Sequence, residues 1–148
     1  MFRGSSFHTI DPKGRVIIPA KFREVVRAKN SEGIMVSKMD KCLVAYPLAE
    51  WGKVESKILA LAERSDVMRR FRRTFIGSAN ECLFDKQERI LIRPELRSYA
   101  QLEKDIVLVG VLDHFEIWSR SNWDKENEEI ENDMKREEVR NEIAKLGL

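Results

Sequence analysis

The sequence predicts an α+β fold built from two similar halves. DPKGRVIIPAKFREV begins at Asp11, and a related segment, DKQERILIRPELRSY, begins at Asp85. After a two-residue shift the similarity resumes, and it extends to Trp51 in the first half and to Trp123 in the second. Apolar, charged and aromatic positions that match over about forty residues indicate a duplication. Because each half is too small to bury a good core alone, we expect the two halves to pack on each other.

The first half should open with two short strands joined by a tight turn. Strands are expected over 7–10 and 15–18, with DPKG between them. Asp11 suits the first position of this turn, Pro12 fixes φ at the second, and Gly14 can adopt a positive φ before the return strand. These residues predict a β-hairpin at the start of the fold.

The remaining elements of the two halves should follow one plan. Proline is tolerated in the first turn of a helix, and Pro19 and Pro94 each stand where a helix is expected to begin. The expected helices are 19–28 and 94–100, and the expected strands are 34–38 and 43–46 in the first half and 81–84, 89–92, 106–111 and 115–119 in the second.

Further helices are expected between the halves and at the end of the chain. Over 48–62, apolar residues recur every three or four positions, as on an amphipathic helix, at Leu48, Trp51, Val54, Ile58 and Leu61. A helix over 66–76 should have Asp66 as its cap and leave its arginines in water. It should bury one apolar face, formed by Val67, Phe71 and Phe75. Asn122 is expected to cap the last helix.

These elements divide the chain into four expected parts. No region is low in complexity and no Gly/Ser-rich linker separates the halves, so helices form the connector. The parts are a first repeat over 5–50, a helical connector over 51–78, a second repeat over 79–122 and a charged C-terminal helix over 123–148.

Composition is typical of a globular protein rather than a membrane or secreted one. The chain has 148 residues and is 43% hydrophobic, which is enough for a core. Its longest apolar run, 106–112, is too short to cross a bilayer, and the N-terminus lacks a signal-peptide stretch. We therefore expect a cytosolic protein. Cys42 and Cys82 should be buried thiols, with a disulfide between them as the less favoured alternative.

The net charge of +2 conceals an asymmetry along the chain. Residues 124–148 contain nine acids and five bases, for a net charge of −4, whereas the first 123 residues contain 22 bases and 16 acids, for a net charge of +6. A basic body with an acidic helical tail is consistent with a polyanionic partner, although charge of this size is also common on solvated surfaces.

Residues for catalysis or metal binding are scarce. The two histidines, His8 and His114, stand in or beside expected strands, where a lone histidine is mostly structural. No HExxH, CxxC, GxSxG or phosphate-binding glycine motif is present, and the Cys and His spacing matches no zinc pattern. Asp11 and Asp85 each precede an arginine by four residues, which should keep both carboxylates ionised. We therefore predict no enzyme activity, no cofactor and no metal site.

The repeated DxxxR pattern is the strongest candidate for a functional site. Its aspartate can accept hydrogen bonds from the turn, so that Arg15 or Arg89 points outward from a strand edge. For a single copy, an arginine that balances a nearby aspartate is the favoured interpretation, but recurrence in both halves favours a function. A guanidinium suits phosphate oxygens and guanine N7 and O6, and a two-stranded β element fits the major groove of DNA. A second arginine cluster, MRRFRR at 68–73, is better explained as a solvated helix face.

Several motifs together resemble one known family. They are MFRG at the start, DPKGR followed by an apolar triplet and Pro19, YPLAEW over 46–51, and the repeated DxxxR. With them, essentially the whole chain resembles the MraZ family of bacterial regulators. Each half resembles the SpoVT/AbrB-like swapped-hairpin module, in which two copies normally come from two chains and interleave. The resemblance implies a pseudo-two-fold β-barrel with flanking helices, formed here by one chain.

The same resemblance implies a function. It implies a sequence-specific DNA-binding transcriptional regulator that recognises short direct repeats upstream of its own division and cell-wall gene cluster. It also implies a ring-shaped homo-oligomer located in the cytoplasm at the nucleoid, with double-stranded DNA as partner and neither a membrane nor a small-molecule substrate. The implied DNA-binding residues are Arg15, Lys13, Arg89 and Lys86, and their structural partners in the two motifs are Asp11, Gly14 and Asp85.

The second copy departs from the first at its tip. Glu88 replaces Gly14, and no proline follows Asp85. A non-glycine residue at positive φ costs on the order of 1 kcal/mol, and Glu88 would set a negative charge beside Arg89. We therefore expect the second tip either to have a different shape or to bind DNA more weakly, so that Arg15 matters more than Arg89.

Two functions of other classes stay open at this point. A ring-forming assembly protein that meets DNA only non-specifically would use the acidic tail and the amphipathic connector to bind protein partners. A small hydrolase has only the presence of acids and histidines in its favour.

Overall fold

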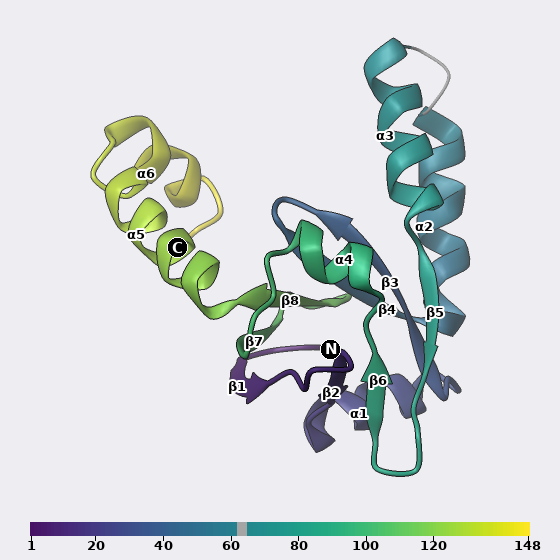
Figure 1. Ribbon diagram of the computed structural model, residues 1–148. Coiled ribbons are helices and arrows are strands. Elements are labelled where there is room, and N and C mark those ends of the chain that lie inside the picture. Colours follow the sequence, from purple (N-terminus) through teal and green to yellow (C-terminus); the bar gives the residue numbers. More distant parts are fainter. Residues whose placement is uncertain (62–64) are drawn as a thin grey trace.

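The computed structural model has a mixed α+β fold centred on antiparallel strands, and it describes residues 1–61 and 65–148 (Figure 1). The strands are β1 (Ser5–Thr9), β2 (Arg15–Ile17), β3 (Gly33–Met39), β4 (Cys42–Pro47), β5 (Asn80–Leu83), β6 (Arg89–Leu91), β7 (Asp105–Gly110) and β8 (Phe115–Ser119). The helices are α1 (Ala20–Ala28), α2 (Leu48–Leu61), α3 (Asp66–Gly77), α4 (Pro94–Tyr99), α5 (Arg120–Asp133) and α6 (Glu137–Ala144). The predicted α+β class is confirmed. Position 62, the expected last residue of α2, lies outside the described residues.

Strand pairing exchanges the opening hairpins of the two halves. β1 of the first half pairs with β7 of the second, and β5 of the second half pairs with β3 of the first. The second strands of the two hairpins, β2 and β6, pair with each other, as do β4 and β8. Exchanging the two halves turns the pair β1–β7 into the pair β5–β3 and leaves the pairs β2–β6 and β4–β8 unchanged. The prediction that the two copies pack on each other is therefore confirmed.

The strand ladders form an open sheet and a separate ribbon. The sheet has the order β1-β7-β8-β4-β3-β5, and β2 and β6 form a two-stranded ribbon. Over residues 1–61 and 65–148, no ladder joins the two edge strands β1 and β5 or connects the ribbon to the sheet. Each ribbon strand has only three residues, because a proline follows it within three positions, at the N-cap of α1 or the first position of α4. Closure into a complete β-barrel therefore stays a prediction.

Alternate residues of the central strands face two hydrophobic clusters. In β7, Ile106 and Leu108 belong to the first cluster, whereas Val107 and Val109 belong to the second. The first cluster also takes residues from β2, β6, α1 and α4, and the second takes residues from α2, α3 and α5. This arrangement follows from the two-residue period of a strand, which sends neighbouring side chains to opposite faces of the sheet.

Three phenylalanines join distant segments at the centre of the first cluster. Phe2 from the N-terminal segment, Phe22 from α1 and Phe115 from β8 are fully buried. Their ring centroids lie 5.0–5.4 Å apart, within the range of favourable aromatic contacts. Because Phe115 belongs to the second half, this contact holds both halves and the N-terminus in one core.

The three tryptophans lie in or against the second cluster. Trp51 and Trp118 are buried, and the partly buried Trp123 packs against the same cluster. Both cysteines are also buried, and both are free thiols, which confirms the favoured prediction. Burial raises the pKa of Cys82 to about 11 and likewise raises that of Cys42. Neither thiol is therefore ionised near neutral pH.

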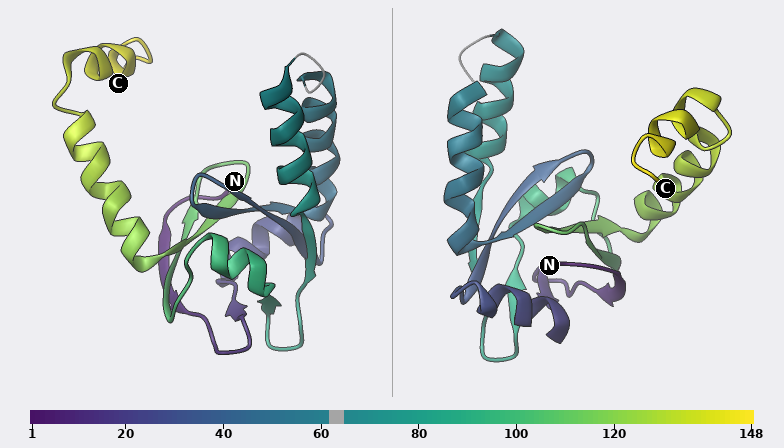
Figure 2. Two further views of the ribbon diagram at one scale, coloured as in Figure 1. Left: turned by 45° about the horizontal axis from the view of Figure 1, so that its top comes forward. Right: turned by 180° about the vertical axis from the view of Figure 1, so that it is seen from behind.

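Two helical arms extend from the sheet body, one on each side (Figure 2). One arm is the α2–α3 hairpin, and the other is α5 followed by α6, which carries the acidic tail away from the body. The loops that join β1 to β2 and β5 to β6 lie at the end of the body opposite the arms (Figure 2, left). None of the described helices is both long and apolar enough to span a membrane.

Three local predictions about the helices were wrong. Ser65, rather than Asp66, caps α3, because its extended backbone lets its side chain accept a hydrogen bond from Met68 N at 3.1 Å. Ser119 caps α5 in the same way and accepts from Asn122 N at 3.0 Å, while the Asn122 side chain binds Gln101. Val67 is 59% exposed because it lies in the first turn of α3, at the outer end of the arm.

Candidate nucleic-acid interface

The first hairpin tip is organised by a single carboxylate. Asp11 Oδ1 accepts hydrogen bonds from Lys13 N at 3.0 Å and Arg15 N at 2.8 Å, and Asp11 Oδ2 accepts one from Arg15 Nε at 2.5 Å. The backbone hydrogen bond from Arg15, together with the contact from its side chain, lowers the pKa of Asp11. The aspartate is therefore an ionised clamp that fixes both the turn and the arginine that follows it.

The second tip repeats this clamp with the same atoms. Asp85 Oδ1 accepts from Gln87 N at 2.8 Å and Arg89 N at 2.9 Å, and Asp85 Oδ2 accepts from Arg89 Nε at 2.9 Å. The backbone hydrogen bond from Arg89 is the main cause that lowers the pKa of Asp85. Two sequences that share only their first and last residues thus form equivalent tips.

Glu88 adopts the backbone conformation of the glycine that it replaces. Its φ is 64°, and that of Gly14 is 92°. Glu88 N and Gly14 N donate equivalent hydrogen bonds to the carbonyls of Asp85 and Asp11, at 3.0 Å and 2.9 Å. The second tip therefore keeps the backbone shape of the first, although Glu88 replaces the glycine. Weaker DNA binding by the second tip stays a prediction.

The Glu88 carboxylate turns toward α1 instead of remaining beside Arg89. It accepts a hydrogen bond from Arg27 Nη2 at 2.7 Å, and Arg23 Nε lies 3.6 Å from it. The first of these contacts raises the pKa of Arg27. The expected negative charge next to Arg89 is therefore offset by two arginines from the other half of the chain.

Each tip is supported by a helix of the opposite half. Arg97 of α4 packs under the first tip, where its Nη1 donates to Pro12 O at 3.4 Å, and Arg23 of α1 lies under the second. The backbone forms matching links, since Ile92 N donates to Gly14 O at 2.8 Å and Ile18 N donates to Glu88 O at 3.1 Å. Sequence reasoning missed this role, although Arg23 and Arg97 occupy matched positions in the repeat.

The two arginines of the DxxxR motifs lie on the outward face of the ribbon. Val16 and Ile90, the middle residues of β2 and β6, point into the core, so Arg15 and Arg89 point the other way. The Arg15 side chain is 35% exposed and the Arg89 side chain 24% exposed. Both arginines are therefore accessible from outside the fold, and DNA binding would require this access.

Arg15 has more free donors than Arg89. Within the described part of the chain, the hydrogen bonds of the Arg15 side chain use only Nε, so both Nη groups are available. Arg89 Nη2 donates to Gln87 Oε1 at 3.1 Å, which occupies one arm of its guanidinium. This difference favours Arg15 as the stronger contact for an external acceptor.

The two predicted lysines lie on the tips but at unequal positions. Both are exposed, and Lys13 is the third residue of its motif whereas Lys86 is the second of its own. Gln87 therefore stands at the place of Lys13, and Lys86 at the place of Pro12. The structure brings all four predicted DNA-binding residues to the two tips and the ribbon between them.

Comparison with known proteins assigns the family. The family model described as "MraZ protein, putative antitoxin-like" matches residues 1–74 and again 75–143. The chain belongs to the MraZ family. The two successive matches confirm the duplication seen in the sequence and in the strand pairing.

Three such relatives carry the name transcriptional regulator MraZ. The protein of Desulforapulum autotrophicum is 60% identical over 148 residues and that of Desulfosudis oleivorans is 52% identical over 148 residues, with all of each chain covered. The protein of Syntrophobacter fumaroxidans is 49% identical over 123 residues, which are 83% of this chain and 82% of that protein. All three relatives from the MraZ family are thus named as regulators of transcription.

The second arginine cluster lies apart from this interface. The MRRFRR segment belongs to α3, which projects from the body at the end away from the ribbon (Figure 1). Phe75 is buried in the second hydrophobic cluster, and Phe71 packs against that cluster. Arg69 forms an ion pair with Asp66. The interpretation as the solvated face of a helix is consistent with these contacts.

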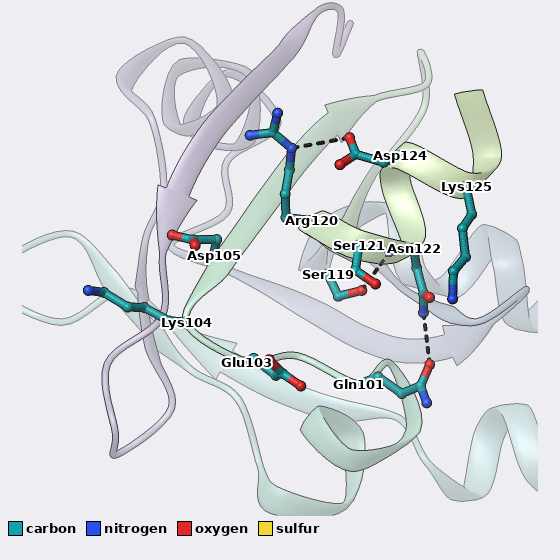
Figure 3. Close-up of a pocket in the computed structure, with 10 residues that line it drawn as sticks. All are labelled: Gln101, Glu103, Lys104, Asp105, Ser119, Arg120, Ser121, Asn122, Asp124 and Lys125. Carbon is teal, nitrogen blue, oxygen red and sulfur yellow. Dashed lines mark hydrogen bonds and ion pairs between the residues drawn. The ribbon is translucent and has the colours of Figure 1, made fainter. Parts of the chain in front are cut away.

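A polar cavity of about 390 Å³ lies beside the start of α5 and does not include the predicted site (Figure 3). Asn122 Nδ2 donates to Gln101 Oε1 at 3.1 Å, and Arg120 Nε donates to Asp124 Oδ1 at 3.2 Å. Its charged residues are balanced, with three acids and three bases, which are Glu103, Asp105, Asp124, Lys104, Arg120 and Lys125. The cavity therefore offers a polyanion no net attraction. Among the described residues, no group of three His, Cys, Asp or Glu side chains could hold a metal ion.

Acid should destabilise the two tips. The folded-state pKa values of Asp11 and Asp85 lie below their ordinary value of 3.8, so both clamps contribute stability above that pH. This contribution is lost as the pH falls through the lowered folded values. We expect thermal melts between pH 7 and pH 2.5 to show that the wild-type protein loses stability below about pH 4. The loss should be steeper than that of the double variant Asp11→Asn, Asp85→Asn. Identical acid profiles would contradict the clamp.

Proposed function

We propose that this protein is a sequence-specific DNA-binding transcriptional regulator that recognises short direct repeats upstream of its own division and cell-wall gene cluster. The observation that carries the proposal is the pair of outward arginines, Arg15 and Arg89, held by equivalent carboxylate clamps on one short ribbon. A clamped arginine loses less freedom on binding than a mobile one, and its fork suits guanine N7 and O6. Lys13 and Lys86 would contact phosphates and position the ribbon.

We also propose that the β elements form a SpoVT/AbrB-like swapped-hairpin barrel. The exchange of β1 and β5 between the halves supports this arrangement. On this proposal the repeats are 5–50 and 79–122, joined by a helical connector over 51–78 and followed by the charged C-terminal helix over 123–148. One chain would then supply both copies of the module.

The binding of direct repeats would follow from ring-shaped assembly. One ribbon offers few contacts and should bind weakly by itself, whereas linked copies raise the effective concentration at the next repeat. Neighbours in a cyclic ring share one rotational sense, which favours direct repeats over palindromes. The protein would act in the cytoplasm at the nucleoid, and we assign it no reaction, cofactor, metal, membrane or small-molecule substrate.

A ring-forming assembly protein with only non-specific DNA contact is the second candidate. The two arms favour it, because α2–α3 and the acidic α5–α6 extend from the body and could bind other proteins. This alternative predicts that protein binding to promoter DNA disappears when excess unrelated DNA competes.

Footprinting of DNA immediately upstream of the protein's own gene would test the proposal. We expect protection of short, evenly spaced direct repeats that persists in excess competitor DNA, and affinity that falls with salt as phosphate contacts require. Uniform protection without repeats, or loss of all protection with competitor, would favour the assembly protein.

A further inference from the structure

We propose that Ile17 and Leu91 help to determine which sequence the protein binds, by contacting thymine methyl groups in the major groove. This inference rests on the proposed function. Ile17 is 52% exposed and Leu91 is 56% exposed, although both are large apolar residues in strands. The residues before them, Val16 and Ile90, are fully buried, so the ribbon separates its core face from its outward face.

The register of the ribbon places one apolar residue opposite each arginine. Arg15 pairs with Leu91, and Ile17 pairs with Arg89. The outward face therefore consists of four residues in which the two arginines lie on one diagonal and the two apolar residues on the other. Diagonal neighbours in an antiparallel pair are about 7–8 Å apart, and successive nucleotides of one DNA strand are about 3.4 Å apart. Guanidinium groups on the diagonal can thus reach bases about two steps apart, with the apolar residues beside them.

The chemistry of this face matches the edges of two bases. Guanine presents N7 and O6 acceptors to an arginine in the major groove, and thymine presents a methyl group to an apolar side chain. A two-stranded ribbon has the right width to enter that groove. The acids near the face are neutralised by their own partners, since Asp11 and Asp85 bind the arginines and Glu88 binds Arg27. The two arginines and their aspartates together carry no net charge, so the exposed Lys13 and Lys86 supply the positive charge of the tips. A face that combines this charge with two arginine forks and two apolar residues fits a DNA groove.

A second copy of the chain fits this face less well. In a two-fold contact between copies, the same face would meet itself, and each copy would bring Arg15 and Arg89 against the like charges of the other. Asp11 and Asp85 offset much of the arginine charge, so the repulsion that disfavours this contact comes mainly from the exposed Lys13 and Lys86 of each copy. The pairing of arginine with an apolar residue therefore favours DNA as the occupant.

Binding of the wild-type protein and three variants to two DNA probes, with scrambled DNA as the reference, would test this inference. One probe is the promoter fragment upstream of the protein's own gene, and the other is the same fragment with deoxyuridine in place of every thymidine in the repeats. We expect the wild-type protein to bind the deoxyuridine probe about threefold to tenfold more weakly, since each lost methyl contact removes a small buried area. Ile17→Ala and Leu91→Ala should bind the thymidine probe correspondingly more weakly and respond less to deoxyuridine. Ile130→Ala, at an exposed apolar position of α5, is the matched control and should behave as wild type.

Each other outcome overturns a distinct statement. In one such outcome, the wild-type protein discriminates between the two probes and the variants bind both probes as it does. That result would overturn this inference but leave the proposed function standing. A wild-type protein that binds repeat and scrambled DNA equally would overturn the proposed function, and this inference with it. A smaller assembly mass for the variants in the absence of DNA would assign the face to contacts between copies and would also overturn it. Ile17→Gln has no methyl group at this exposed position and serves as the test should Ile17→Ala fold poorly.

Discussion

Replacing Arg15 by alanine is expected to abolish most of the preference for promoter repeats over unrelated DNA. The proposed contact is a guanidinium fork with guanine, and the loss of such a contact costs about 1–3 kcal/mol. The effect should multiply when several subunits bind adjacent repeats, because each subunit loses the same contact. Titration of repeat and scrambled DNA at several salt concentrations measures the preference for repeats and the dependence of affinity on salt. Preference should fall sharply, while the dependence of affinity on salt should change little beyond the one lost charge.

Two matched variants separate a base contact from a general loss of charge. Arg15→Lys keeps the charge but lacks the fork, so it should retain phosphate attraction and lose discrimination. Arg89→Ala should have a smaller effect than Arg15→Ala, because Gln87 Oε1 already occupies one arm of the Arg89 guanidinium. An Arg15→Ala protein that binds promoter repeats like wild type would refute the assignment of Arg15.

The parts of the fold that could be predicted from the sequence are those with a local cause. The hairpin tips follow from turn residues, and α2 follows from apolar spacing between Trp51 and Ile58. The exchange of β1 and β5 could not be derived from the residues alone, because each strand would satisfy the same alternation beside its own half. The wrong caps have a similar origin, since Ser65 and Asp66 are both good capping residues and only the backbone decides between them.

The site was predictable in its residues but not in its support. The repeated DxxxR motif located both clamps, because the aspartate and the arginine belong to one turn. Arg23 and Arg97 support tips that lie far away in the sequence, and a lone sequence does not show such contacts. The same holds for Glu88, whose charge was expected to weaken Arg89 but is bound by α1.

Replacing Gly14 by glutamate, the residue at the equivalent position of the second tip, is expected to destabilise the protein by about 2–5 kcal/mol. The φ of Gly14 is 92°, which a residue with a side chain adopts only with strain. A Cβ atom there would lie 2.6 Å from Ile92 O and 2.9 Å from Arg97 Nε. The first obstacle is backbone at the ribbon, so the clash cannot be relieved by turning a side chain alone. Denaturant unfolding of the variant and the wild type measures the loss.

The reverse substitution, Glu88→Gly, is the control and should change stability by no more than about 1 kcal/mol. It removes a strained φ of 64° but also removes the partly exposed ion pair with Arg27, and these two effects oppose each other. If Gly14→Glu is as stable as the wild type, the first tip can make room for a side chain, as the second tip does for Glu88. A large loss in Gly14→Glu alone would mean that the duplicated tips, although alike in backbone, have diverged in how closely the opposite half packs beneath them. Only the second tip would then have room for a side chain, and the first would keep its glycine because Ile92 and Arg97 lie against it.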